Sequence, residues 1–277
     1  IYYFILFAQV DFMAKDNNLK GLSRSELPRF SLLLKTRGLH LVPIFLLIFL
    51  MFGIGLQPAK SAIISGFSAF FFGLIMRESK LNKESLSSFV NSVSQTMIPI
   101  ILIGGAAGII VGVLNITGLG FNLTLGLTEI GKNYGLISML VLTGMVAIIL
   151  GMGMPTAAVY IVLSVVLAPA VIEMGIPVLA AHLFIFYFGL LSMITPPVAV
   201  ASFVAAGIAD ASMWKTSFTA MKLGIAAYLL PFLFVFNDSL LFKGTWKEIL
   251  YISLTCLVSG LILSHVLRDN LKSGFRQ

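Results

Sequence analysis

Charged residues are scarce in this sequence. Only 10% of its 277 residues are Asp, Glu, Lys or Arg, 58% are hydrophobic, and the mean hydropathy is +1.03. Soluble domains average about 25% charged residues, and disordered chains are poor in apolar ones. The composition therefore excludes both classes. We expect an all-α integral membrane protein with about eight apolar elements, because each span takes ~20 residues.

Cysteine and the usual catalytic side chains are also nearly absent from the apolar runs. The single Cys256 excludes a disulfide framework and a thiolate metal site. The runs contain no paired aspartates, no His-Glu motif and no Ser/His/Asp set. His182 has no acidic neighbour in sequence, so we interpret it as an interfacial or backbone-bonded histidine. We therefore expect no enzyme, no cofactor, and no metal ion other than the Na⁺ argued below.

Acidic residues are fewer than basic ones, 11 against 18, which gives a formal net charge of +7. No basic run is interleaved with aromatic residues on a polar face, so we expect no nucleic-acid partner. Most of the Lys and Arg residues, 14 of 18, fall in four segments that the order of elements puts on one side: 15–37, 77–83, 210–222 and 266–277. By the positive-inside rule that side is cytoplasmic, and so is the C-terminus.

Composition divides the chain into four expected parts. The chain begins at Ile1 inside an apolar stretch with no basic leader, so we expect a fragment of a longer protein without a signal peptide. The parts are the end of a helix at 1–10 with a basic cytoplasmic linker at 11–37 (together 1–37), scaffold or arm helices at 38–114, a transport module at 115–209, and C-terminal helices with a cytoplasmic tail at 210–277.

Several apolar runs predict ordinary membrane helices. Four of them lie at about 39–56, 61–76, 219–236 and 246–265. A turn at 57–60 should join the first two into a helical hairpin. A further helix at about 97–114 repeats glycine every four residues, at Gly104, Gly108 and Gly112, which predicts a face for close helix packing.

Two short apolar segments flank a helix-breaking sequence. The segments at 135–150 and 156–172 are separated by Gly151-Met152-Gly153-Met154-Pro155. At ~1.5 Å per residue, an arm of about 16 residues is ~24 Å long, short of the ~30 Å hydrocarbon core. Glycine supplies free φ and proline removes a donor, so both favour a break. The charge bias fits a re-entrant hairpin opening outward or an even number of crossings, and the short arms favour the hairpin.

The next apolar run, at 177–209, is the opposite case. It is too long for one straight span and contains Thr195-Pro196-Pro197. Adjacent prolines end one half-helix and can begin another. The run therefore predicts a discontinuous transmembrane helix.

The two breaks together predict a binding site. Unpaired carbonyls at half-helix C-termini, aided by a hydroxyl, can coordinate Na⁺, and half-helix N-termini favour an anionic substrate. One break alone is more simply a proline kink, but two within ~45 residues are typical of a secondary transporter. The candidate cation ligands are Gly151, Met152, Gly153, Thr156, Thr195 and Pro196, and the candidate substrate contacts are Met154, Pro155 and Pro197.

The region from about 119 to 241 resembles the large permease subunit of tripartite ATP-independent periplasmic (TRAP) transporters, through the motifs GMGMPTAA, AAHLFIFYFG and TPPVAVASF. More narrowly, it resembles the C-terminal half of the form in which the small and large membrane subunits are fused. The resemblance implies an elevator-type, Na⁺-coupled importer in a bacterial or archaeal cytoplasmic (inner) membrane, fed by an extracytoplasmic solute-binding protein. It implies two inverted repeats, each with a re-entrant hairpin and a broken helix. Here the hairpin tip would be 151–156 and the helix would turn at 195–197.

One departure from that family concerns the first repeat, whose Gly/Ser-rich tip and Pro-Pro break are not found in this chain. We therefore expect only the second repeat with preceding scaffold helices, and we expect this polypeptide alone not to transport. Its expected membrane partner is the small membrane subunit or a fused N-terminal half. The substrate is expected to be a small organic acid, since the family handles C4-dicarboxylates, sialic acid and 2-oxo acids.

The alternative function is a non-transporting membrane structural or assembly subunit in the lipid bilayer. It predicts uninterrupted helices with glycine-rich packing faces. The segments 39–76 and 219–265 would satisfy it, but 135–209 would not.

Overall fold

The computed structural model describes residues 1–19, 21, 23, 27, 30–75 and 83–273, and among these it contains helices and turns but no strand. The all-α prediction is therefore confirmed. The chain forms two compact units, one of residues 1–19 and 101–277 and the other of residues 20–100. The boundary falls inside α5 (Lys83–Thr117). The predicted division into four functional parts stays a prediction.

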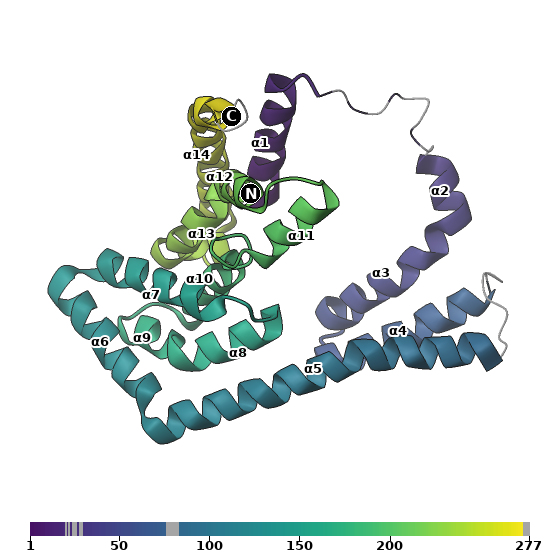
Figure 1. Cartoon of the computed structure of the whole chain (residues 1–277), viewed down its shortest axis with the longest axis horizontal. Coiled ribbons are helices and arrows are strands. Elements are labelled where there is room, and N and C mark those ends of the chain that lie inside the picture. The colour runs from purple at the N-terminus through teal and green to yellow at the C-terminus, as the bar shows by residue number, and fades with distance from the viewer. Residues whose placement is uncertain (20, 22, 24–26, 28–29, 76–82, 274–277) are drawn as a thin grey trace. The chain divides into compact units, whose positions relative to one another are not determined.

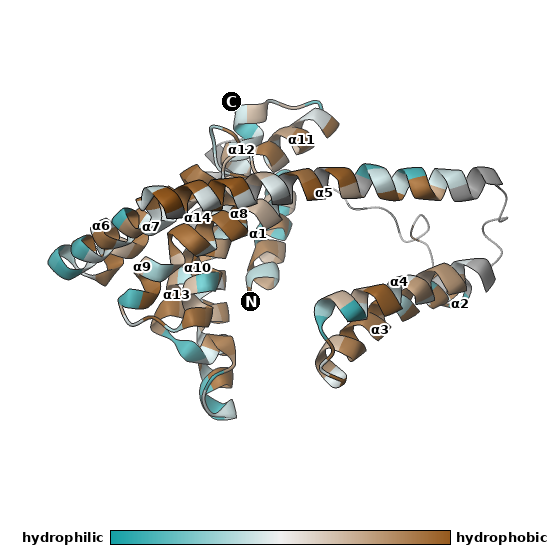
Figure 2. Cartoon of the chain, turned by 90° about the horizontal axis from the view of Figure 1, so that it is seen from below, coloured by the Kyte–Doolittle hydropathy of each residue, from teal (hydrophilic) through white to brown (hydrophobic). Residues whose placement is uncertain are grey.

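The smaller unit contains the predicted helical hairpin. Its elements before α5 are α2 (Phe30–Arg37), the 3₁₀ turn η1 (Gly38–Leu41), α3 (Val42–Ile48), the π-turn η2 (Phe49–Gly53) and α4 (Pro58–Ile75). Helices α3 and α4 pack against each other, and both are mostly apolar (Figure 2). The turn lies at 54–57 instead of the predicted 57–60, because Pro58 already begins α4, at the first helical position that proline favours.

Helix α5 is a single element of 35 residues. It begins 14 residues before the predicted residue 97, because residues 83–96 contain neither glycine nor proline to end a helix. A Cβ built at Gly108 or Gly112 meets nothing within 4 Å. The predicted packing face is therefore open at these two glycines, and the chain turns by 67° before α6 (Leu119–Tyr134).

The larger unit holds the remaining helices (Figure 1). After α6 they are α7 (Leu136–Gly151), α8 (Thr156–Val166), α9 (Ala168–Glu173), α10 (Val178–Leu191), α11 (Val200–Ile208), α12 (Met213–Leu223), α13 (Ile225–Phe236), the 3₁₀ turn η3 (Asp238–Leu241) and α14 (Trp246–Ser273). The first helix of the chain, α1 (Tyr2–Asp16), belongs to the same unit and packs on α14.

Helix α10 is the centre of this unit, since α7, α8 and α13 all pack against it. Phe184 and Ile185 of α10 are fully buried. The Phe184 ring lies 4.8 Å from Phe188 and 5.3 Å from Phe232 of α13, in tilted and edge-to-face arrangements that aromatic pairs favour. The three rings fix α13 against α10.

Helices α1 and α14 approach each other closely at Gly260. A Cβ there would overlap the side chain of Ile5, so the glycine permits the short interhelical distance that small residues give in membrane proteins. Helix α1 runs to Asp16, six residues beyond the predicted end at residue 10. Asp11 and Lys15, expected in the linker, instead form an i,i+4 ion pair at 2.7 Å on this helix.

Fewer helices reach membrane-spanning length than the sequence predicts. Within the described residues, two are long and apolar enough, Met213–Phe236 and Trp246–Val266, or three if the bent pair 108–134 counts as one span. The first begins six residues before the predicted residue 219, and α14 continues eight residues beyond the predicted residue 265. Helices α7, α8 and α10 are apolar but shorter, because the chain breaks after each.

Candidate functional site

The first predicted break connects α7 to α8. Gly153 has φ of +77°, in the left-handed region that glycine enters without strain. The Met154 amide donates to the Gly151 carbonyl at 3.4 Å, and the Pro155 carbonyl accepts from Val159 at 3.0 Å. Proline loses no hydrogen bond at this position because an N-cap residue needs no intrahelical donor. The glycines and proline therefore make a compact turn where the sequence predicted one.

The turn projects from the core. Gly151 is buried, Met152 and Met154 are half-buried, and three residues are exposed: Gly153, Pro155 and Thr156. Thr156 is the first residue of α8. The N-terminus of this half-helix, with its free N–H groups and partial positive charge, is therefore accessible.

The second break begins earlier than the sequence predicts. Helix α10 ends at Leu191, four residues before Thr195, and α11 resumes at Val200. The Leu191 carbonyl accepts from the Thr195 amide at 3.0 Å and from its hydroxyl at 2.6 Å. The Ala201 amide donates to the Met193 carbonyl at 3.0 Å. The backbone groups that lose their helical partners at Pro196 and Pro197, and the Thr195 hydroxyl, thus find hydrogen-bond partners largely within the loop.

The two breaks meet at their helix C-termini. A Cβ built at Gly151, the last residue of α7, would lie 2.8 Å from the Gly189 carbonyl oxygen and 2.9 Å from Ser192 Oγ. Ser192 is buried and donates to the Gly189 carbonyl at 2.6 Å. On its other side, a Cβ at Gly189 would meet Val159 of α8 at 2.5 Å. The absence of side chains at Gly151 and Gly189 lets both hairpin arms reach α10.

Sequence reasoning missed Gly189 and Ser192. The available signal was the small pair in the otherwise bulky run FYFGLLS, since small residues mark close helix contacts in membrane proteins. Gly144, two turns earlier in α7, also packs closely on α10: a Cβ there would lie 2.9 Å from the Phe188 ring.

The broken helix also rests on the α12–α13 segment. The hydroxyl oxygens of Thr195 and Tyr228 lie 2.6 Å apart. One turn earlier, a Cβ at Gly224 would lie 3.0 Å from Ile194 Cδ1. Tyr228 was not predicted, because nothing in its local sequence distinguishes it from a packing aromatic.

The chain matches the family described as the tripartite ATP-independent periplasmic transporter, DctM component, over residues 1–249. The chain belongs to the DctM family. Its members are the large permease subunits of TRAP transporters, so this chain is a multi-pass membrane permease component. The match also covers residues 1–118, beyond the region whose motifs carried the resemblance. No curated protein and no solved structure matches the chain significantly.

Neither break of this DctM chain, 152–155 or 192–199, contains an acidic residue. Glu129, Glu173 and Asp210 are exposed, and no group of three His, Cys, Asp or Glu within the described ranges could hold a metal ion. A cation at the breaks would therefore be held by carbonyl and hydroxyl oxygens. His182 is bonded to a side chain rather than to the backbone, since its Nδ1 lies 3.0 Å from the Tyr160 hydroxyl of α8.

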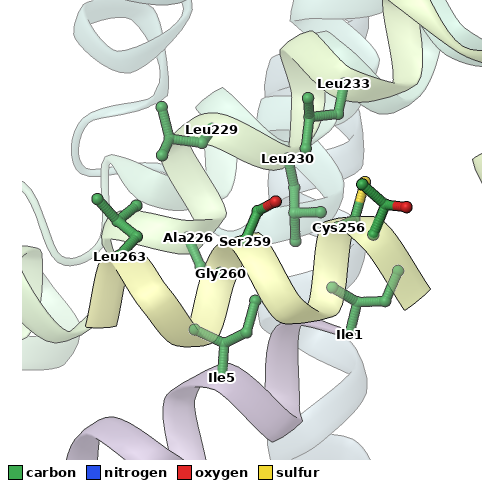
Figure 3. A pocket seen from close by; sticks show the side chains of 11 residues that line it. Ile1, Ile5, Ala226, Leu229, Leu230, Leu233, Cys256, Ser259, Gly260 and Leu263 are labelled. Carbon is green, nitrogen blue, oxygen red and sulfur yellow. The ribbon is translucent and has the colours of Figure 1, made fainter. Parts of the chain in front are cut away.

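A separate hollow lies between α1, α13 and α14 (Figure 3). Its volume is about 280 Å³, and its lining is mostly aliphatic, with Ile5 from α1, Leu233 from α13, and Cys256 and Ser259 from α14. None of the predicted site residues lines it. Cys256 is partly buried there, as expected for a packing thiol.

Proposed function

We propose that this chain supplies one broken-helix pair of a Na⁺-coupled TRAP permease that imports a small organic acid. The observation that carries the proposal is the contact between the C-termini of α7 and α10, at Gly151 and Ser192. Helix C-termini carry partial negative charge, and a carbonyl that accepts one hydrogen bond keeps a second lone pair, so two such ends at one point favour a cation. A DctM permease with two such breaks fits a secondary-transport site.

In this proposal the two breaks divide the ligands. Carbonyls of Gly151, Met152 and Gly153 with the Thr156 hydroxyl serve one coupling Na⁺, and the Thr195 hydroxyl with the Pro196 carbonyl serves another position. The organic acid binds where the N-termini of α8 and α11 offer N–H groups to a carboxylate. Met154, Pro155 and Pro197 are its nearest candidate contacts.

The partners follow from the same proposal. An extracytoplasmic solute-binding protein delivers the acid, and the small membrane subunit or a fused N-terminal half completes the permease in the cytoplasmic membrane. An assembly subunit is the weaker alternative, because it predicts uninterrupted helices, whereas this chain breaks after α7 and again after α10.

The test uses the complete transporter that contains this chain, reconstituted in vesicles with its loaded solute-binding protein. Thr195→Val keeps the side-chain volume but removes the oxygen, so the Na⁺ concentration for half-maximal uptake should rise roughly tenfold or more. Thr195→Ser keeps the oxygen and should stay near the wild type. Uptake by the wild type that does not depend on Na⁺ would refute the coupling, and an unchanged Na⁺ requirement in Thr195→Val would remove Thr195 from the site.

A further inference from the structure

The second break is attached to α13 through a hydrogen bond between two side chains, those of Thr195 and Tyr228. Thr195 is half-buried, and its hydroxyl oxygen lies 2.6 Å from that of Tyr228. The two residues are 33 positions apart in the chain. We infer that Tyr228 is a positioning residue, whose hydroxyl holds the Thr195 oxygen in the orientation in which it faces the coupling cation. This inference rests on the proposed function of Thr195.

Hydrogen-bond accounting gives the direction of the pair. A threonine hydroxyl has one proton and two lone pairs. The Thr195 proton is used toward the Leu191 carbonyl, which can only accept. Tyr228 must therefore donate to Thr195, and this donation occupies one lone pair of Thr195 Oγ1. One lone pair is left, and its direction is fixed by the other two bonds.

A second contact shows that the attachment is a surface rather than an isolated bond. Gly224 lies between α12 and α13 as the capping residue of both, and a Cβ there would lie 3.0 Å from Ile194 Cδ1. Gly224 and Tyr228 are four residues apart, so they lie on the same helix face. Ile194 and Thr195, consecutive residues of the break, therefore contact consecutive turns of α12–α13. The helix face holds the loop in place while the hydroxyl pair orients its oxygen.

The first experiment measures the Na⁺ dependence of uptake in the complete transporter. Tyr228→Phe removes the donor but keeps the ring, and it should raise the half-saturating Na⁺ concentration roughly three- to tenfold, as the loss of one hydrogen bond allows. The maximal rate at saturating Na⁺ should stay within about twofold. Tyr187→Phe, which removes a hydroxyl from the neighbouring helix α10, is the matched control and should leave both quantities unchanged.

The Na⁺ requirement of a double variant shows whether Tyr228 acts through Thr195 or independently of it. Because Tyr228 acts through Thr195, the double variant Thr195→Val/Tyr228→Phe should need no more Na⁺ than Thr195→Val alone. An unchanged Na⁺ requirement in Tyr228→Phe, or effects that multiply in the double variant, would overturn the inference. A loss of maximal rate with unchanged half-saturation would also overturn it, since that pattern indicates a structural role alone.

A second measurement does not depend on transport. Val200 begins α11 and is 44% exposed, so Val200→Cys in a Cys256→Ala background can be labelled with a small polar maleimide. Tyr228→Phe should increase the labelling rate there severalfold because the break loses its attachment. Ile208→Cys, at the far end of α11, is the control whose rate should not change.

The uptake and labelling measurements distinguish failure of the proposed Na⁺ coupling from failure of the positioning role. If wild-type uptake ignores Na⁺ while Tyr228→Phe still accelerates labelling at position 200, the proposed coupling fails and Tyr228 keeps its positioning role. If uptake depends on Na⁺ but labelling at position 200 is unchanged by Tyr228→Phe, the coupling stands and the positioning role is refuted.

Discussion

The two helix breaks resemble each other in sequence but differ in how they are held. The turn between α7 and α8 has four residues, 152–155; its Gly153 and Pro155 are exposed, and so is Thr156, the first residue of α8. The loop between α10 and α11 has eight residues, 192–199, and it is bonded to Tyr228 and packed on Gly224. One break is a free tip on a rigid base, and the other is attached to the neighbouring helix.

The difference indicates which part of this unit is expected to move and which to stay rigid. Elements that open locally have few buried contacts and exposed backbone, as the hairpin tip does. The base of the hairpin is closely packed, because Gly151 contacts the C-terminal end of α10. We therefore expect substrate access to be controlled at the tip, while the attached break keeps its geometry.

The largest expected effect concerns membrane topology. It compares the side of the membrane on which the two ends of α7–α9 lie with that of the two ends of the broken helix α10–α11. If α7–α9 form a re-entrant hairpin, Tyr134→Cys and Glu173→Cys should both react with a membrane-impermeant maleimide from outside, in a Cys256→Ala background. Val178→Cys and Ala211→Cys flank the broken helix, and they should react from opposite sides. These positions are exposed and avoid the positive-φ glycines at 135 and 175. Reaction of Tyr134→Cys and Glu173→Cys from opposite sides would exclude the hairpin.

The next effect concerns the shared base of the breaks. Gly151→Ala places a Cβ 2.8 Å from a backbone oxygen of α10, so the helices must separate, at a cost of about 1–3 kcal/mol. The melting temperature in detergent should fall accordingly. Gly126→Ala, in α6 with open space around the glycine, is the control and should be neutral or slightly stabilising. A stable Gly151→Ala variant would show that the contact is not a packing constraint.

A smaller effect separates the two threonines. Thr195→Val loses bonds to Leu191 and Tyr228 and should lower the free energy of unfolding by about 1–2 kcal/mol. Thr156 is exposed, so Thr156→Val should change it by no more than about 0.5 kcal/mol. Both variants should nevertheless weaken Na⁺ dependence if both oxygens are ligands. Equal stability losses would contradict the contrast between a free tip and an attached loop.

The smallest expected effect concerns the hydrogen bond between Tyr160 of α8 and His182 of α10. Tyr160→Phe removes the hydroxyl that bonds His182 but keeps the ring contact with Phe186. We expect a loss of about 0.5–1 kcal/mol in stability, because Tyr160 is partly exposed and a net hydrogen bond contributes little there. Thermal unfolding of Tyr160→Phe beside Tyr251→Phe, an exposed tyrosine of α14, measures it. If Tyr160→Phe and Tyr251→Phe unfold at the same temperature, the Tyr160–His182 bond adds no stability and α8 is held on α10 by packing alone.

The helix ends show what local patterns predict poorly. Polarity suggested that α1 ends near residue 10 and α14 near residue 265, yet both continue for several residues. Polar residues continue a helix as readily as apolar ones when glycine and proline are absent. Hydropathy therefore marks the part of a helix suited to lipid, and not where the helix ends.

The sequence alone determined the membrane class, the family and the position of each break to within a few residues. Composition decides the first, and the glycine and proline at 151–155 and 195–197 act on their own backbone, so no distant residue is needed to predict a turn there. Only the tertiary structure decided which breaks and small residues come into contact. Gly108 and Gly112 look like a packing face and are open, whereas the isolated Gly151 and Gly189 are the closely packed ones. The Thr195–Tyr228 pair joins residues 33 positions apart, and such a contact depends on how α10 and α13 pack, which no local pattern encodes.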